Sequence, residues 1–358
     1  MSARLMLAGY FGCGNLGDDA ILLGFLEGIR EKNYELITLS GSPDRIMNNY
    51  GLRGIPRLDF NEVNKALDEV DALVFPGGSI FQDVTSLRSV GYYYKLAANA
   101  RRKKKKVVML GQGVGPLNRA FGKMLTAKAF NMADAIAVRD PVSAQMLKQI
   151  GVKTTPRTAA DMAFLLPKPT ALEEANRYGV GGMKTIGISV RPHGRDKGKG
   201  VANLFADVCR RMFAEQNMTV LIEMDQIHDK AVMDMVSKAN GGKVPEIRNL
   251  PSPVAAQQRI ARMDGVIAMR LHAGILAATV GVPPFMVSYD PKVTAFANLL
   301  GLPNAPSIEG LTSGRLVDLF NDFMRTRDRY AQSLPEKMAS LAEQARQNIR
   351  VLESVLGE

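Results

Sequence analysis

The chain has 358 residues, 46% hydrophobic and 23% charged, a length and composition typical of a globular protein with two domains. Aromatic residues make up only 6% and Trp is absent, which argues against a stacking platform for single-stranded nucleic acid. The formal net charge of +11 indicates an anionic partner, either a nucleic acid, a membrane surface or an acidic substrate.

Short apolar runs alternate with amphipathic segments along the first half of the chain. Strands are expected at residues 4–8, 35–39, 72–75, 107–110 and 135–138. Helices are expected at residues 18–31, 87–103 and 141–150. Strands that alternate with helices predict right-handed βαβ units and a parallel sheet.

A second series of the same kind follows. Strands are expected at 185–190, 219–223, 265–269 and 284–287, and helices at 201–215 and 273–280. Between the two series lies a segment rich in Pro and Gly, and the last 45 or so residues have a helical pattern. We therefore predict an N-terminal Rossmann-like domain (1–168), a linker (169–183), a C-terminal Rossmann-like domain (184–311) and C-terminal helices that pack back (312–358).

A glycine-rich motif follows the first expected strand. Gly12-Cys13-Gly14-Asn15-Leu16-Gly17 has the spacing of a dinucleotide fingerprint. However, Asp18 and Asp19 stand where a pyrophosphate needs positive potential, and no acidic residue ends the second strand to hold a ribose. One Asp can complement the helix dipole, whereas two carboxylates also suit a ligand with hydroxyl groups, such as a sugar.

Two more glycine-rich segments follow later strands. Pro76-Gly77-Gly78-Ser79 leads to Asp83, and Gly111-Gln112-Gly113-Val114-Gly115-Pro116 comes after the next strand. Arg139 follows the fifth strand, where it could also form a simple ion pair with the next helix start. Because ligands bind at the carboxyl ends of parallel strands, these segments predict a binding crevice at one edge of the sheet.

Basic groups occupy the corresponding positions of the second series. Arg191 follows its first strand, Arg270-Leu271-His272 a later one, and Lys292 the last. Arg binds phosphate or carboxylate through two parallel hydrogen bonds, and His can transfer protons near neutral pH. This half of the chain therefore favours a small phosphorylated anion, whereas the first half favours a sugar acceptor.

Other sequence features limit the cellular setting. Cys13 and Cys209 match no metal or redox spacing, so no metal site is expected and a reducing cytoplasm is favoured. We expect no signal peptide and no membrane span. The run Arg101, Arg102, Lys103, Lys104, Lys105 and Lys106 is either a solvated helix end or a patch for anionic lipid, which suggests peripheral binding at the inner face of the cell membrane.

Several motifs together resemble the polysaccharide pyruvyltransferases, over about residues 4–300. The opening motif runs from Gly9 to Ala20, and further matches are Gly77-Gly78-Ser79, Val138-Arg139-Asp140, Arg270-Leu271-His272 and Tyr289-Asp290-Pro291-Lys292-Val293. The sequence is most similar to the CsaB type, which pyruvylates a cell-wall polymer precursor. The family pattern has an aromatic residue, usually Trp, after Arg191-Pro192, but here the residue is His193.

The resemblance implies a GT-B-like fold of two doubly wound α/β domains facing a cleft. It also implies transfer of a pyruvyl ketal from phosphoenolpyruvate, as co-substrate and without a cofactor, to a sugar with release of phosphate. For the CsaB type the implied acceptor is a β-linked N-acetylmannosamine on a lipid-diphosphate-linked disaccharide, which connects the enzyme to secondary cell-wall polymer and S-layer anchoring.

Roles for individual residues follow as hypotheses. We expect His272 to act as the acid–base residue and Asp18 to accept a proton from, or orient, the acceptor hydroxyl. Phosphoenolpyruvate is expected to bind to Arg270, Leu271, Arg139 and Lys292. The acceptor is expected to contact Asn15, Gly17, Asp19, Gly77, Gly78, Ser79, Asp83 and Arg191.

Three alternatives stay open at this point. A nucleotide-sugar glycosyltransferase of the same fold would need a carboxylate for the ribose in the second domain. A non-catalytic protein that binds an anionic polymer or a membrane surface would leave Arg270 and His272 unexplained. Nucleic-acid binding lacks a basic helix face with base-reading residues.

Overall fold

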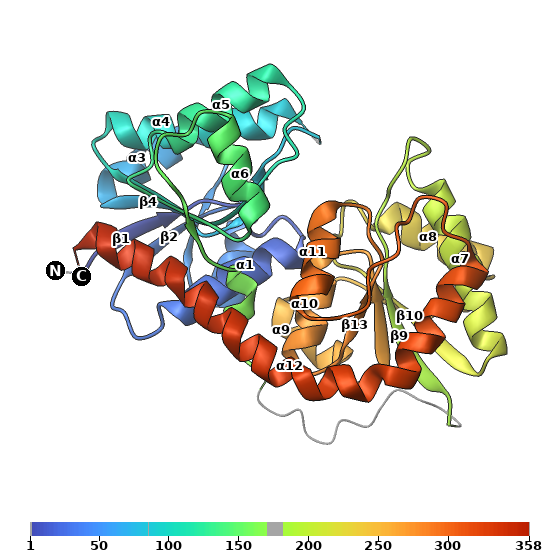
Figure 1. The fold of residues 1–358 in the computed structure, drawn as a ribbon. Helices are drawn as coiled ribbons and strands as arrows, with labels where there is room; N and C mark the ends of the chain where they lie inside the picture. The colour runs from blue at the N-terminus through green and yellow to red at the C-terminus, as the bar shows by residue number, and fades with distance from the viewer. Residues whose placement is uncertain (1, 85, 170–181, 358) are drawn as a thin grey trace. The chain divides into compact units, whose positions relative to one another are not determined.

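The computed structural model describes residues 2–84, 86–169 and 182–357 (Figure 1). The chain divides into two compact units. The first holds Met1–Cys13, Asp18–Leu166 and Ser340–Glu358, and the second holds Gly14–Gly17 and Pro167–Ala339. The expected linker at 169–183 lies almost wholly outside the described residues.

The first unit is built on one parallel sheet. Its strands are β1 (Arg4–Leu7), β2 (Glu35–Ser40), β3 (Arg53–Pro56), β4 (Ala72–Phe75), β5 (Gly78–Phe81), β6 (Lys106–Val114), β7 (Ala135–Val138) and β8 (Arg157–Thr158). In the part of this unit that the structure describes, the strand order is β3-β2-β1-β4-β6-β7-β8, and β5 pairs with β6. The register changes along the β6–β7 pair between Met109 and Gln112.

Helices lie on both faces of this sheet, as a parallel sheet requires. They are α1 (Leu16–Gly28), α2 (Pro43–Tyr50), α3 (Phe60–Glu69), α4 (Leu87–Arg102), α5 (Ala120–Phe130) and α6 (Pro141–Gln149), with a short 3-10 turn η1 (Met162–Leu165). Asp59, Ser86 and Asp140 cap α3, α4 and α6 by accepting backbone N–H groups. The core between the sheet and the α3–α6 face includes the ring contacts Phe75–Tyr93 and Phe81–Phe130.

The second unit repeats the doubly wound pattern. Its strands are β9 (Lys184–Ser189), β10 (Asn217–Ile222), β11 (Glu246–Ile247), β12 (Gly265–Ala268) and β13 (Pro284–Met286), in the order β11-β10-β9-β12-β13 over the described residues. Its helices are α7 (Lys199–Ala214), α8 (Lys230–Ala239), α9 (Pro253–Ile260), α10 (Leu271–Thr279) and α11 (Pro291–Leu299). All strand pairings in this sheet are parallel.

A long helix, α12 (Ser313–Leu356), ends the described chain. Its first part belongs to the second unit, where Phe320 and Phe323 pack against Phe285. Its last part belongs to the first unit, where buried Asn348 donates to the carbonyl oxygen of Ala160 at 2.9 Å. The predicted helical C-terminal segment is confirmed, as one continuous helix.

The predicted α/β fold class is confirmed, since both sheets are parallel and helices alternate with their strands. The expected end of a strand at residue 110 was wrong. β6 continues to Val114, because Gly111 adopts a positive φ of 54° and lets the strand bulge, and because buried Gln112 donates to the carbonyl oxygens of Phe75 and Leu110. β3, β5, β8 and β11 were not predicted.

Candidate functional site

Both sheets have a topological switch point, where neighbouring crossovers leave in opposite directions. It lies between β1 and β4 in the first unit and between β9 and β12 in the second. Ligands of open α/β sheets bind outside the carboxyl ends of the strands at such points. The segments after β1 and β4 contain the predicted glycines and carboxylates, and those after β9 and β12 contain Arg191 and Arg270.

The turn after β1 separates the roles of the two predicted aspartates. The side chain of Asp19 is fully buried and accepts the N–H of Gly12 at 2.8 Å, where Gly12 has a φ of +63°. Burial raises the pKa of the Asp19 carboxyl. Asp18 is half-buried and lies against Gly78, where an added Cβ would be 3.3 Å from Asp18 Oδ1. Asp19 therefore holds the turn, and Asp18 is the better placed to meet a ligand.

Arg139 positions Ser79 in the first unit. Its guanidinium donates to Ser79 Oγ at 2.7 Å and to Asp161 at 2.6 Å, and its side chain is only 7% exposed. Gly113 makes room for it, because an added Cβ would lie 2.6 Å from an Arg139 nitrogen. Because the Arg139 side chain is buried and already donates to Ser79 and Asp161, it fits the positioning of Ser79 better than direct contact with a ligand. Asp161 was not predicted, because it belongs to none of the sequence motifs.

Two other predicted acceptor residues have different environments. Asp83 is buried, and its two carboxylate oxygens accept the N–H groups of Asn118 and Arg119, each at 2.7 Å. These bonds hold the loop before α5, so Asp83 has a structural role. Gly77 has a φ of +147°, and its site accommodates Ile21, which would lie 3.0 Å from an added Cβ.

The second unit holds Arg270 in a network of carboxylates. Arg270, at the N-terminal end of α10, donates from Nε to the fully buried Asp229 at 3.0 Å and also binds it through Nη2. Arg270 Nη2 lies 3.5 Å from Asp225. Asp225 also binds His228 Nδ1 at 2.9 Å, and this hydrogen bond raises the pKa of His228. These carboxylates set the direction of the Arg270 side chain.

Asp225 and Asp229 were not predicted, although both follow the expected strand at 219–223. The rule that located Arg270 would have located them as well.

His272 lies in the first turn of α10, immediately after Leu271, and packs against Gly17. An added Cβ on Gly17 would approach His272 Nδ1 to 2.5 Å, so only glycine fits there. Gly17 belongs to the segment Gly14–Gly17, which groups with the second unit. Asn15 holds this segment by accepting the Gly17 N–H at 2.9 Å and donating to Asp225 at 3.3 Å. Predicted residues Asn15, Gly17 and His272 thus share one unit.

Arg191 stacks on an aromatic ring beside this network. Its guanidinium carbon lies 4.0 Å from the ring centre of Tyr289, and its buried Nε has no hydrogen-bond partner. His193 lies 6.1 Å from the same ring, measured between ring centres. Lys292, at the start of α11, has its Nζ 3.4 Å from Asp290 and is partly exposed. Within the described part of the chain, Arg191 is therefore a cation that is positioned by an aromatic face and not by a carboxylate.

The basic run 101–106 lies at the opposite edge of the first sheet, at the amino end of β6. Five of its six side chains bind groups of the same unit: Asp134 (Arg101), Asn99 (Arg102), the side chain and carbonyl of Asp68 (Lys103, Lys105) and the Val355 carbonyl (Lys106). This pattern favours a structural role. Across the described residues, we find no helix with the length and apolar character needed to span a membrane.

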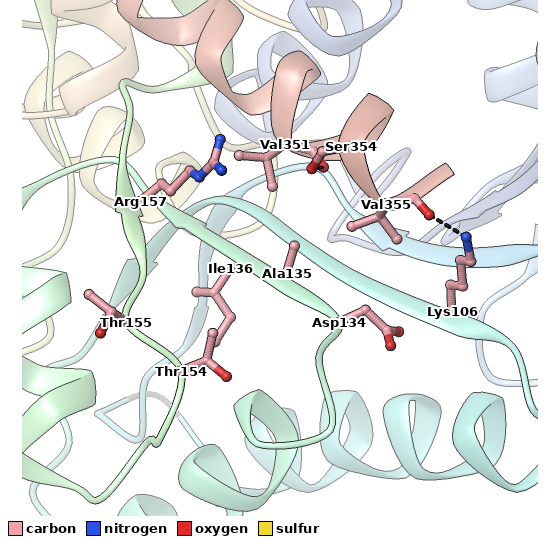
Figure 2. A pocket seen from close by; sticks show the side chains of 10 residues that line it. All are labelled: Lys106, Asp134, Ala135, Ile136, Thr154, Thr155, Arg157, Val351, Ser354 and Val355. Atoms are coloured by element: carbon pink, nitrogen blue, oxygen red, sulfur yellow. Dashed lines mark hydrogen bonds between the residues drawn. The ribbon is translucent and has the colours of Figure 1, made fainter. Parts of the chain in front are cut away.

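A pocket of about 420 Å³ lies beside this run, at the amino ends of β6, β7 and β8 (Figure 2). Lys106, Asp134 and Arg157 line it from the sheet, and Val351 and Ser354 from the end of α12. Figure 2 shows Lys106 bonded to the carbonyl of Val355. The pocket is thus at the edge away from the switch point and contains none of the predicted site residues.

Comparisons with known proteins agree with these observations. Residues 15–291 match a family model described as polysaccharide pyruvyl transferase. The amylovoran biosynthesis protein AmsJ of Erwinia amylovora is 26% identical over 307 residues, which cover 78% of this chain and 71% of that protein.

Three solved structures share the fold. HepE from Anabaena, in complex with UDP-glucose, has a TM-score of 0.66 at 12% identity, covering 99% of this chain and 100% of that one. UDP-GlcNAc 2-epimerase from Neisseria meningitidis, bound to UDP-GlcNAc, has a TM-score of 0.62 at 10% identity, with 99% and 100% covered. ADP-heptose LPS heptosyltransferase II from E. coli has a TM-score of 0.52 at 13% identity, with 92% and 100% covered. The likeness confirms the expected GT-B-like fold class.

Proposed function

Because the chain belongs to the polysaccharide pyruvyl transferase family, we propose that it transfers the pyruvyl group of phosphoenolpyruvate to a polysaccharide sugar as a cyclic ketal. In this reaction C2 of phosphoenolpyruvate forms bonds to two sugar oxygens, and its bond to the phosphate oxygen breaks. One hydroxyl proton ends on the methylene carbon, which becomes a methyl group, and the other leaves with phosphate. The proposal rests on three cations of the second unit, Arg191, Arg270 and Lys292, which follow β9, β12 and β13.

Phosphoenolpyruvate binds to the second unit in this proposal. Its phosphate and carboxylate contact Arg191, Arg270 and Lys292, which lie after three of the strands at one edge of the sheet. We assign Arg191 to phosphoenolpyruvate and not to the acceptor, because none of the described carboxylates pairs with it and its guanidinium lies over Tyr289. Tyr289 also interacts electrostatically with Arg270. Arg270 is held in direction by Asp229, so its binding geometry is preorganised.

His272 is the proposed acid–base residue. It lies in the first turn of α10, and Gly17 leaves space for its imidazole. In the proposed sequence His272 delivers the proton to the methylene carbon and recovers one from the attacking hydroxyl, a role typically worth about 10²–10⁴-fold in rate. Arg270 and Lys292 balance the charge that develops on the leaving phosphate.

The acceptor binds to the first unit in this proposal. Asp18 orients the acceptor hydroxyl, and Ser79, fixed by Arg139, donates to a neighbouring sugar oxygen. Gly78 allows the backbone to approach Asp18 closely. Asp19 and Asp83 support the surrounding turns and do not touch the sugar.

The resemblance to the CsaB type supports a finer proposal. The acceptor is a β-linked N-acetylmannosamine on a lipid-diphosphate disaccharide, and the product is a precursor of secondary cell-wall polymer. Such a lipid-linked substrate puts the enzyme at the cytoplasmic face of the membrane. The proposal does not need the basic run 101–106, whose side chains mostly bind groups within their own unit.

A nucleotide-sugar glycosyltransferase is the alternative that the fold allows. Its ribose would need a carboxylate near the end of β10, and Asp225 occupies that place. Asp225, however, already binds His228, Asn15 and two backbone N–H groups. This arrangement favours phosphoenolpyruvate over a nucleoside diphosphate.

The test incubates the protein with phosphoenolpyruvate and a panel of aryl-linked and lipid-diphosphate-linked sugars. We expect phosphate release and a mass gain of one ketal on at least one sugar, and loss of both in a folded His272→Ala variant. Transfer from a UDP-sugar, with no ketal formed on any acceptor, would instead support the glycosyltransferase. Normal turnover by His272→Ala would remove His272 from the mechanism.

A further inference from the structure

In the first unit, Arg57 lies among aromatic rings at the carboxyl edge of the sheet. Arg57 follows β3 directly, and its backbone N–H donates to the carbonyl of Ser40 at the end of β2. Its guanidinium carbon lies 5.0, 4.7 and 5.9 Å from the ring centres of Tyr10, Tyr92 and Tyr93. The Tyr92 hydroxyl donates to the Arg57 carbonyl at 2.8 Å and so fixes one wall of the cluster.

The charge of Arg57 has no anionic partner among the residues that the structure describes. Its Nη atoms lie 3.6 Å from Cys13 Sγ and 3.4 Å from the Tyr93 hydroxyl oxygen, and its Nε is buried without a hydrogen bond. Burial raises the pKa of the Cys13 thiol and of the Tyr92 phenol, so both stay neutral at pH 7. Arg139, in the same unit, touches the carboxylate of Asp161.

A partly buried guanidinium without a counter-charge is unfavourable unless a ligand supplies one. The aromatic faces hold Arg57 in one direction, which is the arrangement of a preorganised anion site. The cluster also neighbours the proposed acceptor residue: Asp18 contributes, after burial and the opposing effect of Arg57, to the raised pKa of Tyr93 and of Cys13. The Arg57 cluster (Arg57, Tyr10, Tyr92, Tyr93 and Cys13) therefore lies near Asp18, on the same sheet edge.

We infer that the Arg57 cluster binds an anionic group of the acceptor saccharide, beside the sugar that receives the ketal. This inference rests on the proposed function for the identity of the substrate. The anionic group is either the carboxylate of an acidic sugar or the phosphate of a phosphate-linked saccharide, and both match the two-pronged guanidinium. The partly exposed rings of Tyr10 and Tyr92 add apolar surface for a sugar face, whereas the Tyr93 ring is buried.

Binding and transfer are measured separately, so that the two proposals can fail independently. Saturation-transfer NMR titrations compare methyl β-glucuronide, glucose 1-phosphate and neutral methyl β-glucoside on the full chain. We expect at least one anion to bind about 10- to 100-fold more tightly than the neutral sugar, and Arg57→Gln to remove that difference. Arg57→Lys keeps the positive charge but loses the two-pronged guanidinium geometry, and should retain part of the preference for the anion over the neutral sugar.

Arg30→Gln is the matched control, because Arg30 is an exposed Arg of the same unit that pairs with Glu27. It should leave the preference for anions unchanged. The inference is overturned if wild type prefers neither anion, or if folded Arg57→Gln keeps the wild-type preference. If anion binding depends on Arg57 but no acceptor receives a ketal, the proposed function fails while the anion site stands. The probe that binds distinguishes a carboxylate from a phosphate source.

Discussion

Replacing Asp229 by Asn tests how Arg270 is held. Asp229 uses one oxygen for the Arg270 guanidinium and the other for the N–H groups of Met224 and Asp225, at 3.2 and 3.0 Å. An Asn side chain has one oxygen and one NH2 group. Whichever way it turns, its NH2 group faces donors, either the guanidinium or the two backbone N–H groups. The substitution therefore loses both the charge and half of the hydrogen bonds.

The expected loss of stability follows from the burial of the Asp229–Arg270 pair. The side chain of Asp229 is fully buried and that of Arg270 is 15% exposed, so water cannot replace the lost partner. Removing one charge of a buried ion pair costs about 3 to 5 kcal/mol. At roughly 2–4 °C per kcal/mol for a unit of this size, the expected fall in Tm is on the order of 10 °C. Because Arg270 loses its direction, KM for phosphoenolpyruvate should also rise.

Thermal unfolding followed by circular dichroism and steady-state kinetics of phosphate release measure the two effects. Asp234→Asn is the control, since Asp234 lies on α8 and pairs with Lys230 and Arg248 at a more exposed position. It should change stability by less than about 1 kcal/mol. A Tm for Asp229→Asn within about 2 °C of wild type, together with an unchanged KM, would refute this reasoning.

Three further outcomes are expected. Gly17→Ala should lower kcat by about 100-fold with a smaller effect on KM, because its Cβ would lie 2.5 Å from His272 Nδ1 and displace the imidazole. Arg191→Met should raise KM for phosphoenolpyruvate by about 10- to 100-fold without lowering Tm, since Arg191 forms no ion pair with the residues that the structure describes. The bond to Asp225 raises the pKa of His228, so this stabilisation is complete below about pH 6.5 and is lost as pH rises through the folded-state pKa. Tm of wild type should therefore fall more between pH 6 and 9 than Tm of His228→Gln.

Controls for these variants use positions that touch no site. Gly91→Ala, in α4, meets nothing within 4 Å and should keep kcat while leaving stability equal or slightly higher. Equal kcat for Gly17→Ala and wild type would contradict the packing of His272 on Gly17. A lowered Tm for Arg191→Met would indicate a structural role, and parallel pH curves for His228→Gln and wild type would remove the Asp225 bond as their cause.

Much of the fold could be predicted from the sequence, because the alternation of apolar strands and amphipathic helices is visible in short sequence segments. The strands that were missed are very short or contain residues typical of loops. β8 and β11 have two residues each, β5 starts at Gly78, and β3 contains Gly54 and ends at Pro56. β6 was cut short because glycines within a strand look like a loop until a neighbouring strand supplies their hydrogen bonds. Pairing with β5 and β7 keeps this segment extended.

The site was only partly readable for a related reason. Arg270 and His272 stood out because they follow a clear strand, whereas Arg57 follows β3, a strand that was not predicted. The sequence also could not distinguish a buried residue from an exposed one when both belong to the same motif. Asp18 and Asp19 are neighbours, but only the tertiary packing shows that Asp19 is buried on the Gly12 N–H.

The sequence alone determined the two α/β series, the glycine-rich and basic strand ends and the resemblance to a pyruvyltransferase, since residue type and short-range order carry these features. Its net charge of +11 pointed to an anionic partner without locating it. Only the tertiary structure decided which cations lack an internal counter-charge, because ion pairs such as Arg139–Asp161 and Arg270–Asp229 join residues 22 and 41 positions apart. Arg191 and Arg57 are the two half-buried cations at the proposed sites for which we find no ion pair among the described residues.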